Sequence, residues 1–221
     1  MASTFFGLHI GSSALSSFQV ATNTTANNIA NVKTTGYTRQ EATLQAKDAI
    51  NVTARYGSVG TGVTVTSIKQ QRDLYYDNKY WENNSCYGRY EQKLYYMEQI
   101  QNYFKDNGSS VKGFSSVFSQ MFSDLDTLRS KPSDKTVRNQ FISSAQSLCT
   151  YFNQMSDNLS KLQDDCNEEI RNNVDKINSI SEKISLLNKE INQIETGTGV
   201  EASSLRDERA NLIDSLSKIV K

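Results

Sequence analysis

The 221-residue chain is poor in residues on which many enzymes and small secreted proteins depend. It has one proline, where average usage would give about 11. This scarcity favours long uninterrupted helices, because proline breaks a helix interior. The only histidine, His9, argues against a histidine-based catalytic triad or a multi-histidine metal site. Three cysteines without a CxxC spacing predict reduced, structural side chains and no disulfide framework. They are Cys86, Cys149 and Cys166.

The chain also lacks net charge and long apolar runs. Lysine plus arginine and aspartate plus glutamate both number 24, so no basic surplus indicates a nucleic-acid partner. No apolar run approaches the ~20 residues that cross a bilayer, and the N-terminus shows no basic segment followed by an apolar stretch and a cleavage site. We therefore predict a soluble protein with no membrane insertion, no nucleic-acid partner and no cleavable signal. Apolar residues at 37% predict a thin, elongated core.

No enzyme chemistry stands out, and we predict no catalytic site, no cofactor and no metal. Gly57, Gly60 and Gly62 precede a strand-like run and do not open a helix, as a phosphate-binding loop would. One group of carboxylates could supply an acid and base pair or an oxygen-ligand site, but its helical spacing also fits a solvated face. We favour the solvated face. The group contains Asp164, Asp165, Glu168 and Glu169.

Residues 3–32 carry a weakly apolar stripe at alternating spacings of three and four, which predicts one face of a helix. The stripe includes a glycine and two threonines, so it is too poor to stabilise an isolated helix. We predict a helix that needs a partner. Its positions are Leu8, Gly11, Leu15, Phe18, Thr22, Thr25, Ile29 and Val32.

The end of this stripe is the most specific part of the sequence. Residues 26–40 read ANNIANVKTTGYTRQ, in which the asparagines and Gly36 can end a helix and turn the chain. The ordered string Ala-Asn-Asn-x-Ala-Asn followed by Thr-x-Gly-Tyr resembles the N-terminal signature of the bacterial flagellar rod, hook and hook-associated proteins. Its continuation over residues 36–40 is most similar to the hook-associated protein 1 family, which forms the junction between hook and filament.

The middle of the chain predicts a short β segment and then helices. A β-branched alternating run over residues 63–68 indicates a strand or hairpin. Residues 72–104 predict a tyrosine-rich amphipathic helix whose rows could stack bases or sugars. With no basic surplus, we favour helix packing with wet hydroxyl ends. The two rows are Tyr76, Tyr90, Met97 and Phe104, and Tyr80, Tyr87 and Leu94.

The second half predicts long helices arranged as an antiparallel hairpin. A shorter helix over residues 114–128 ends near Pro132, and Ser133 can cap a helix that continues to about residue 195. The turn over residues 195–199 reverses the chain, and Ser203 or Ser204 can cap a final helix. Residues 205–214, LRDERANLID, are similar to a Leu-x-Asp-x-Arg-x-x-Leu stretch of flagellin-like axial proteins.

These patterns and the resemblance imply a mainly α fold: an elongated helical bundle or coiled-coil rod with long antiparallel helices, a short β-hairpin-like segment and an N-terminal assembly helix. Residues 1–40 are assigned to the inner assembly helix and signature, 41–71 to a β linker and 72–221 to the rod-like helical domain. The family's outer domains and C-terminal helix are missing, so we expect this chain to be the N-terminal portion of a longer protein. Chaperone binding is not carried over.

By resemblance, the chain is a structural subunit that passes through the flagellar type III export apparatus and assembles outside the cell at the hook–filament junction. Its implied partners are itself, the hook protein, the next junction protein and the export apparatus. We hypothesise that the apolar stripe is buried against neighbouring subunits, that the asparagines bond backbone across subunits, and that Gly36 makes the turn. Arg39 would reach a neighbour's carboxylate or carbonyl. The predicted assembly residues are Leu8, Leu15, Phe18, Asn27, Asn28, Ile29, Asn31, Gly36, Tyr37 and Arg39.

Three alternatives stay open at this point. A hook or rod protein of the same flagellar class is the nearest, because it shares the N-terminal signature. A generic coiled-coil scaffold would explain the regularly spaced apolar rows of the long predicted helices, which recur every seven residues, but not residues 27–40. A small enzyme that uses tyrosine and carboxylate side chains would leave both unexplained.

Overall fold

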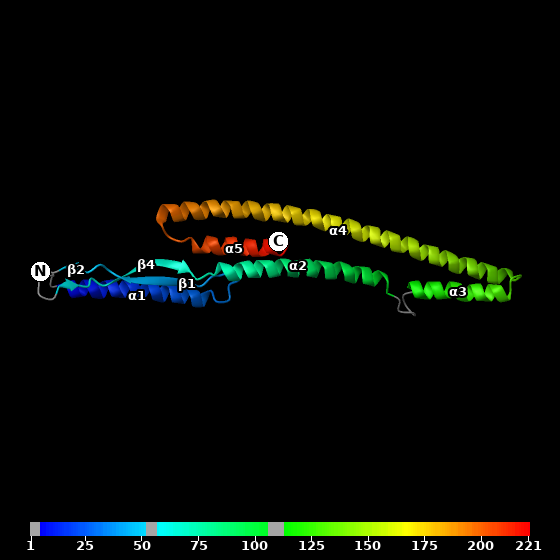
Figure 1. The fold of residues 1–221 in the computed structure, drawn as a ribbon, viewed down its shortest axis with the longest axis horizontal. Coiled ribbons are helices and arrows are strands. Elements are labelled where there is room, and N and C mark those ends of the chain that lie inside the picture. The colour runs from blue at the N-terminus through cyan, green and yellow to red at the C-terminus, as the bar shows by residue number, and fades with distance from the viewer. Residues whose placement is uncertain (1–4, 52–56, 106–112) are drawn as a thin grey trace. The chain divides into compact units, whose positions relative to one another are not determined.

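The computed structural model describes residues 5–51, 57–105 and 113–221, and in these the chain is mainly α. Figure 1 shows the elements in chain order. The helices are α1 (Phe6–Ala30), α2 (Leu74–Tyr103), α3 (Phe114–Ser130), α4 (Lys135–Thr198) and α5 (Ser203–Ser217). The strands are β1 (Gln40–Ala46), β2 (Ile50–Asn51), β3 (Ser58–Val59) and β4 (Val63–Gln70). The predicted mainly α fold with long helices is confirmed; the first two residues of the predicted 3–32 helix lie outside the described residues.

The chain divides into two compact units, one formed by Met1–Ser85 with Ile177–Lys221 and the other by Cys86–Lys176. In the first unit, β1 and β4 form an antiparallel pair from Gln40 opposite Gln70 to Ala46 opposite Val63. The register shifts by one residue between Thr43 and Leu44. The helix α1 lies along this pair (Figure 1). The strand predicted over residues 63–68 is therefore present, with β1 as its partner.

The contact between α1 and the sheet is close because the residues that meet are small. The hydroxyl of Ser17 donates to the Val63 carbonyl over 3.1 Å. Gly62 has φ of +106°, and a Cβ there would lie 2.2 Å from the Ser13 hydroxyl oxygen. Only glycine allows both this backbone conformation and this approach.

The first unit also contains the turn between α4 and α5, where Gly199 has φ of +70°. Glu195 receives two hydrogen bonds from the Arg206 guanidinium, at 2.7 and 2.8 Å, and Arg206 also pairs with Glu201 at 2.5 Å. The predicted chain reversal is confirmed, but the predicted serine cap is wrong. Ala202 occupies the cap position without a side-chain bond, and its N–H donates to Glu195 over 3.1 Å. The Glu195 carboxylate thus accepts a backbone N–H at the start of α5, as the side chain of a capping residue would do.

We expect Arg206→Gln to lower the free energy of unfolding by about 1–3 kcal/mol at pH 7, because two carboxylates lose a charged donor. The Arg206 hydrogen bonds and the Ala202 N–H lower the pKa of Glu195 from 4.5 to about 2. A carboxyl with a lowered folded pKa stabilises above its unfolded pKa, and this contribution is lost as the pH falls from about 4.5 through about 2. Denaturant unfolding at pH 7, 4 and 2 should show the difference between the two proteins shrinking. A difference that does not change with pH would contradict this account.

The second unit is held by an aromatic cluster and by hydrogen bonds to one half-buried carboxylate. Ring centroids of Phe114 and Phe118 on α3 lie 5.1 Å apart, and Phe114 lies 5.9 Å from Phe152 on α4. Gln92 and Tyr96 of α2 both donate to the Glu169 carboxylate of α4, and this hydrogen bond raises the pKa of Tyr96. One of the four carboxylates assigned to a solvated face therefore joins two helices.

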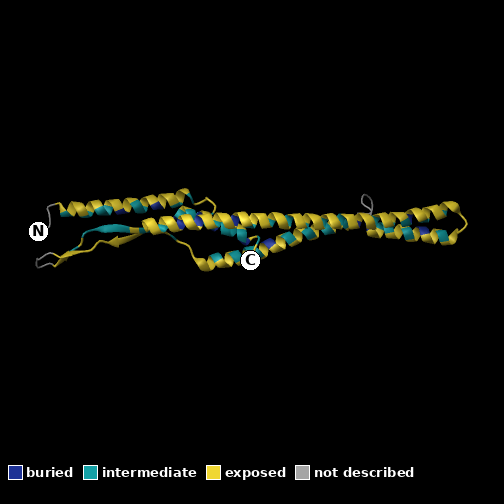
Figure 2. Cartoon of the chain, turned by 90° about the horizontal axis from the view of Figure 1, so that it is seen from above, coloured by how far each residue is buried: buried dark blue, intermediate teal, exposed yellow. Residues whose placement is uncertain are grey.

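Helix α4 runs for 64 residues without a break. It begins at Lys135, and the carboxylate of Asp134, in place of the predicted Ser133, accepts the Thr136 N–H over 2.8 Å. Few side chains along the helices are fully covered (Figure 2). The apolar side chains buried on α4 are Met155, Ile180, Leu187 and Ile191, and Ser144 is buried with them. The described helices include none that is long and apolar enough to cross a membrane.

Candidate functional site

Helix α1 exposes a stripe of apolar side chains, and its two buried side chains are polar. Its 25 residues contain no aspartate, glutamate, lysine or arginine. Leu15 and Ile29 are 71% and 69% exposed, whereas Ser17 and Thr24 are only 5% and 8% exposed. A surface helix of a soluble domain normally has the opposite arrangement. Exposed apolar patches are characteristic of the interaction surfaces of proteins.

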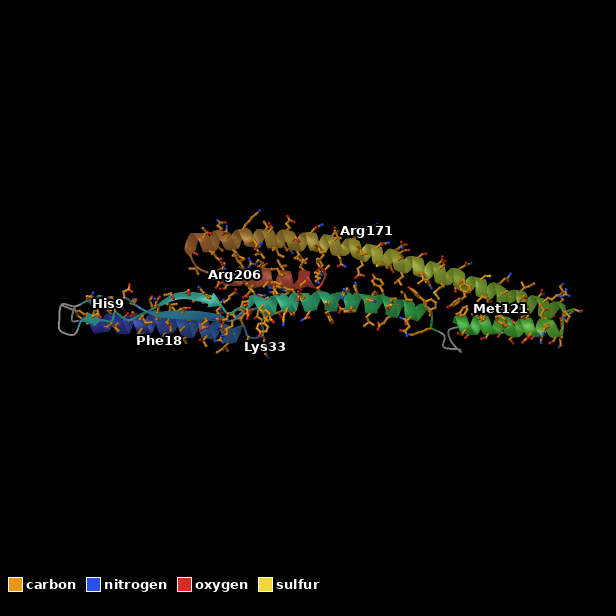
Figure 3. The ribbon with its side chains drawn as sticks, in the orientation of Figure 1. His9, Phe18, Lys33, Met121, Arg171 and Arg206 are labelled. Atoms are coloured by element: carbon orange, nitrogen blue, oxygen red, sulfur yellow. The ribbon has the colours of Figure 1, made fainter. Side chains whose placement is uncertain are left out.

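We call this stripe the outer face of α1. It consists of the exposed side chains Leu8, Leu15, Phe18 and Ile29, followed by Val32 just beyond the helix. Figure 3 labels Phe18 on α1 in the first unit and Arg206 on α5. The predicted periodicity is therefore correct, and the structure adds the direction in which the stripe points. Within the described residues, nothing covers the outer face.

The signature at the end of α1 is organised around the Asn28 carboxamide. Its Nδ2 donates to the Gln40 carbonyl over 2.8 Å, and its Oδ1 accepts the Gln40 N–H over 2.9 Å. Asn28 thus pairs with the first residue of β1 as a neighbouring strand would. The Tyr37 hydroxyl donates to the same Oδ1 over 2.9 Å and accepts from Asn27 over 3.1 Å. These bonds fix the end of α1 to the start of the sheet.

The remaining signature residues build the turn between helix and strand. Asn31 donates to the Asn27 carbonyl over 3.0 Å, and Thr34 donates to Asn31 over 3.2 Å. Gly36 has φ of +77°, a left-handed conformation that favours glycine. Burial first, and then the charge of Asp207, raise the pKa of Tyr37. The signature turn is therefore held by hydrogen bonds within its own chain.

A groove lies between the C-terminal half of α1 and the start of β1. Its volume is about 550 Å³, and its apolar lining includes Ala21, Ile29 and Val32. Arg39 and Glu41 line it with opposite charges. The structure thus places five of the predicted assembly residues beside the same groove: Asn28, Ile29, Asn31, Tyr37 and Arg39.

The structure brings some predicted site residues together and leaves others apart. Asn27, Asn28 and Tyr37 form one hydrogen-bonded cluster within the chain. Leu8 and Leu15 share the outer face with no contact to that cluster. Bonds from the asparagines across subunits remain a prediction, because the asparagines here have partners in their own chain.

Helix α2 exposes its aromatic rows, so the helix packing predicted for them is not made within the described residues and stays a prediction. Tyr76, Tyr80 and Tyr90 are all more than half exposed. The inner side is formed by Trp81, whose Nε1 donates to Asp214 of α5 over 2.7 Å, and by Asn84, which donates to the Asp214 carbonyl over 3.0 Å. The sequence analysis missed this polar contact because hydrophobic periodicity does not report it.

Comparison with known proteins extends these observations. Residues 8–38 match the family of the flagella basal body rod protein, and residues 97–221 match the helical domain of flagellar hook-associated protein FlgK. These two matches place the chain among proteins of the bacterial flagellum. The chain belongs to the family of the flagellar hook-associated protein FlgK.

Individual relatives carry the same name. The chain is 34% identical over 225 residues to flagellar hook-associated protein 1 of Bacillus subtilis strain 168, covering 100% of this chain and 44% of the relative. It is 33% identical over 215 residues to the Salmonella typhimurium protein and 31% identical over 214 residues to the Escherichia coli K12 protein, covering 94% of this chain and 37% of each relative. The chain thus spans less than half the length of these curated relatives.

Proposed function

We propose that this chain is part of a structural subunit at the junction between flagellar hook and filament, where it acts by self-assembly after type III export. The observation that carries the proposal is the outer face of α1, an exposed apolar stripe on a helix without charged residues. The family match and the shared name of the relatives support the flagellar setting. The proposed location is outside the cell, in the assembled flagellum.

The mechanism we propose is burial of the outer face against neighbouring axial subunits. Within the chain, the two buried residues of α1 are Ser17 and Thr24, and its apolar side chains Phe6, Ile10 and Val20 are only half-buried, so folding of the chain leaves much of the apolar surface of α1 in water. Most of the apolar burial available to α1 would come on assembly. A helix held this weakly can remain unfolded during export and gain order on joining the polymer.

We propose a separate role for each of three parts of the chain. Residues 1–40 supply the assembly helix and the signature, 41–71 the β linker, and 72–221 the helical domain. The proposed partners are further copies of the chain, the neighbouring hook protein, the next junction protein and the export apparatus. Nucleic acid is not proposed as a partner, because the charges balance at 24 of each sign.

Immunogold labelling of isolated flagella tests the proposed location. We expect label confined to the boundary between hook and filament. A rod or hook protein is the competing assignment, supported by the match of residues 8–38 to the rod protein family. Label along the hook or in the basal body would establish that alternative and contradict the junction assignment.

A further inference from the structure

One face of α5 carries three polar side chains, each directed to a different segment of the first unit. Asp207, Asn211 and Asp214 are spaced by four and three residues, which places them on one helical face. Asp214 contacts Trp81 of α2. The other two reach the end of β4 and the signature turn, and these two contacts connect the second sequence motif with the first.

Asn211 packs directly against the signature turn. A Cβ built on Gly36 would lie 1.8 Å from the Asn211 Oδ1 and 2.2 Å from its Nδ2. The turn backbone therefore rests on the carboxamide with no room for a side chain between them. The glycine is required here for the close approach to α5 as well as for its positive φ.

Asp207 holds the end of the sheet next to that turn. It is only 9% exposed, and its Oδ1 accepts a hydrogen bond from the Gln70 side chain over 2.8 Å. Gln70 also donates to the Ser203 carbonyl over 2.9 Å, and its backbone N–H donates to Glu201 over 3.0 Å. The last residue of β4 is thus tied to the start of α5 at three points.

These contacts form a continuous path from α5 to the assembly helix. Gln70 stands opposite Gln40 in the sheet register, and the backbone of Gln40 is paired with the Asn28 carboxamide of α1. Fixing Gln70 therefore fixes Gln40, and through it the end of α1. Asn211 restrains the turn that joins the same two elements.

We propose that Asp207 and Asn211 are positioning residues for the assembly surface: they hold the signature turn and sheet so that the outer face of α1 is presented in one orientation. The inference rests on the proposed function, because it assigns the role of this surface to assembly. Two further residues of the 205–214 motif bind α4: Arg206 binds Glu195 and Arg209 binds Asn188. The two sequence motifs thus act as one unit.

The test is a double variant, Asp207→Ala with Asn211→Ala, examined for local exchange and for incorporation. Alanine favours helix, so α5 itself should not be weakened by loss of propensity. We expect the Tyr37 and Gln40 amides to exchange about tenfold or more faster, because each buried hydrogen bond lost removes stabilisation of this order. Exchange at α4 amides should not change. Incorporation into flagella, in cells that carry the variant in place of the natural gene, should fall about tenfold.

Two control variants make the result specific. Glu208→Ala is on the same helix but exposed, and it should behave as the natural protein in both assays. Asp207→Asn retains an oxygen acceptor for Gln70, so its amide exchange and its incorporation should stay close to those of the natural protein. If circular dichroism shows that the double variant does not fold, the single Asn211→Ala variant gives the same test.

Either of two results would overturn the inference: unchanged exchange at Tyr37 and Gln40, or normal incorporation despite faster exchange. A second double variant, Leu15→Asp with Ile29→Asp, distinguishes failure of the positioning role from failure of the proposed function. If this outer-face variant incorporates normally, the assembly surface itself is refuted. If the outer-face variant does not incorporate but the α5 variant does so normally, only the positioning role is refuted.

Discussion

Replacing Leu15 and Ile29 with aspartate will abolish incorporation into the flagellum while leaving the thermal unfolding of the chain nearly unchanged. Both side chains are about 70% exposed in the isolated chain, at 71% and 69%, so charges there remain solvated. In the assembled state each aspartate would be a buried carboxylate without a partner, which costs several kcal/mol. Two such groups correspond to a loss of binding of at least about 100-fold.

The measurement is the number of filament-bearing cells together with the melting curve of the purified chain. A matched control replaces the same two residues with methionine, which keeps apolar surface of similar size and should incorporate normally. Normal filaments in the aspartate variant would contradict the assembly role of the outer face. A large drop in melting temperature would show that these residues serve folding of the chain.

Gly36→Ala is the second substitution for which we expect a large effect. The residue has φ of +77°, which costs a side-chain-bearing residue about 1–2 kcal/mol. Its new Cβ would also displace the Asn211 carboxamide, 1.8 Å away, from the turn. We expect a total loss of about 2–3 kcal/mol in the free energy of unfolding, measured by denaturant titration.

A double-mutant cycle separates the two causes. Asn211→Ala removes the side chain that collides with the new Cβ, so Gly36→Ala should cost less in that background, leaving the cost of the backbone conformation alone. Equal costs of Gly36→Ala in both backgrounds would show that Asn211 does not restrain the turn. A negligible cost in both would mean that the turn conformation itself is wrong.

The sequence predicted the elements of this chain better than the direction in which their faces point. The spacing of Leu8, Leu15 and Ile29 gave the helix and its stripe, but periodicity does not say whether a stripe faces a core or solvent. The two buried positions of α1 are Ser17 and Thr24, and Ser17 meets the sheet backbone at Val63, where a close approach requires a small side chain. No hydrophobic pattern reports such a contact.

The sheet and α2 show the same limit. The strand β1 reads QEATLQA, a polar sequence without β-branched alternation, so it was not predicted from its own residues and is set by its partner β4. On α2 the tyrosine rows predicted packing, yet the inner side is Trp81 and Asn84. Their partners on α5 lie about 130 residues away in sequence, at a separation of 133 for Trp81 with Asp214.

The signature was predicted in part. Gly36 and the asparagines indicated a turn after a helix, and the turn is present with a positive φ at Gly36. The pairing of the Asn28 carboxamide with the Gln40 backbone was not predicted, because it depends on the position of Gln40 in the folded sheet. The contact with Asn211 required both motifs to be placed in space.

The central claim is that the outer face of α1 is exposed in the free chain and covered in the flagellum. Hydroxyl-radical footprinting of Phe18 tests it directly, because this ring is reactive and is 57% exposed in the chain. We predict that Phe18 is oxidised readily in the free protein and is protected when isolated hook–filament structures are labelled in the same way. Equal oxidation of Phe18 in the two states would contradict the account.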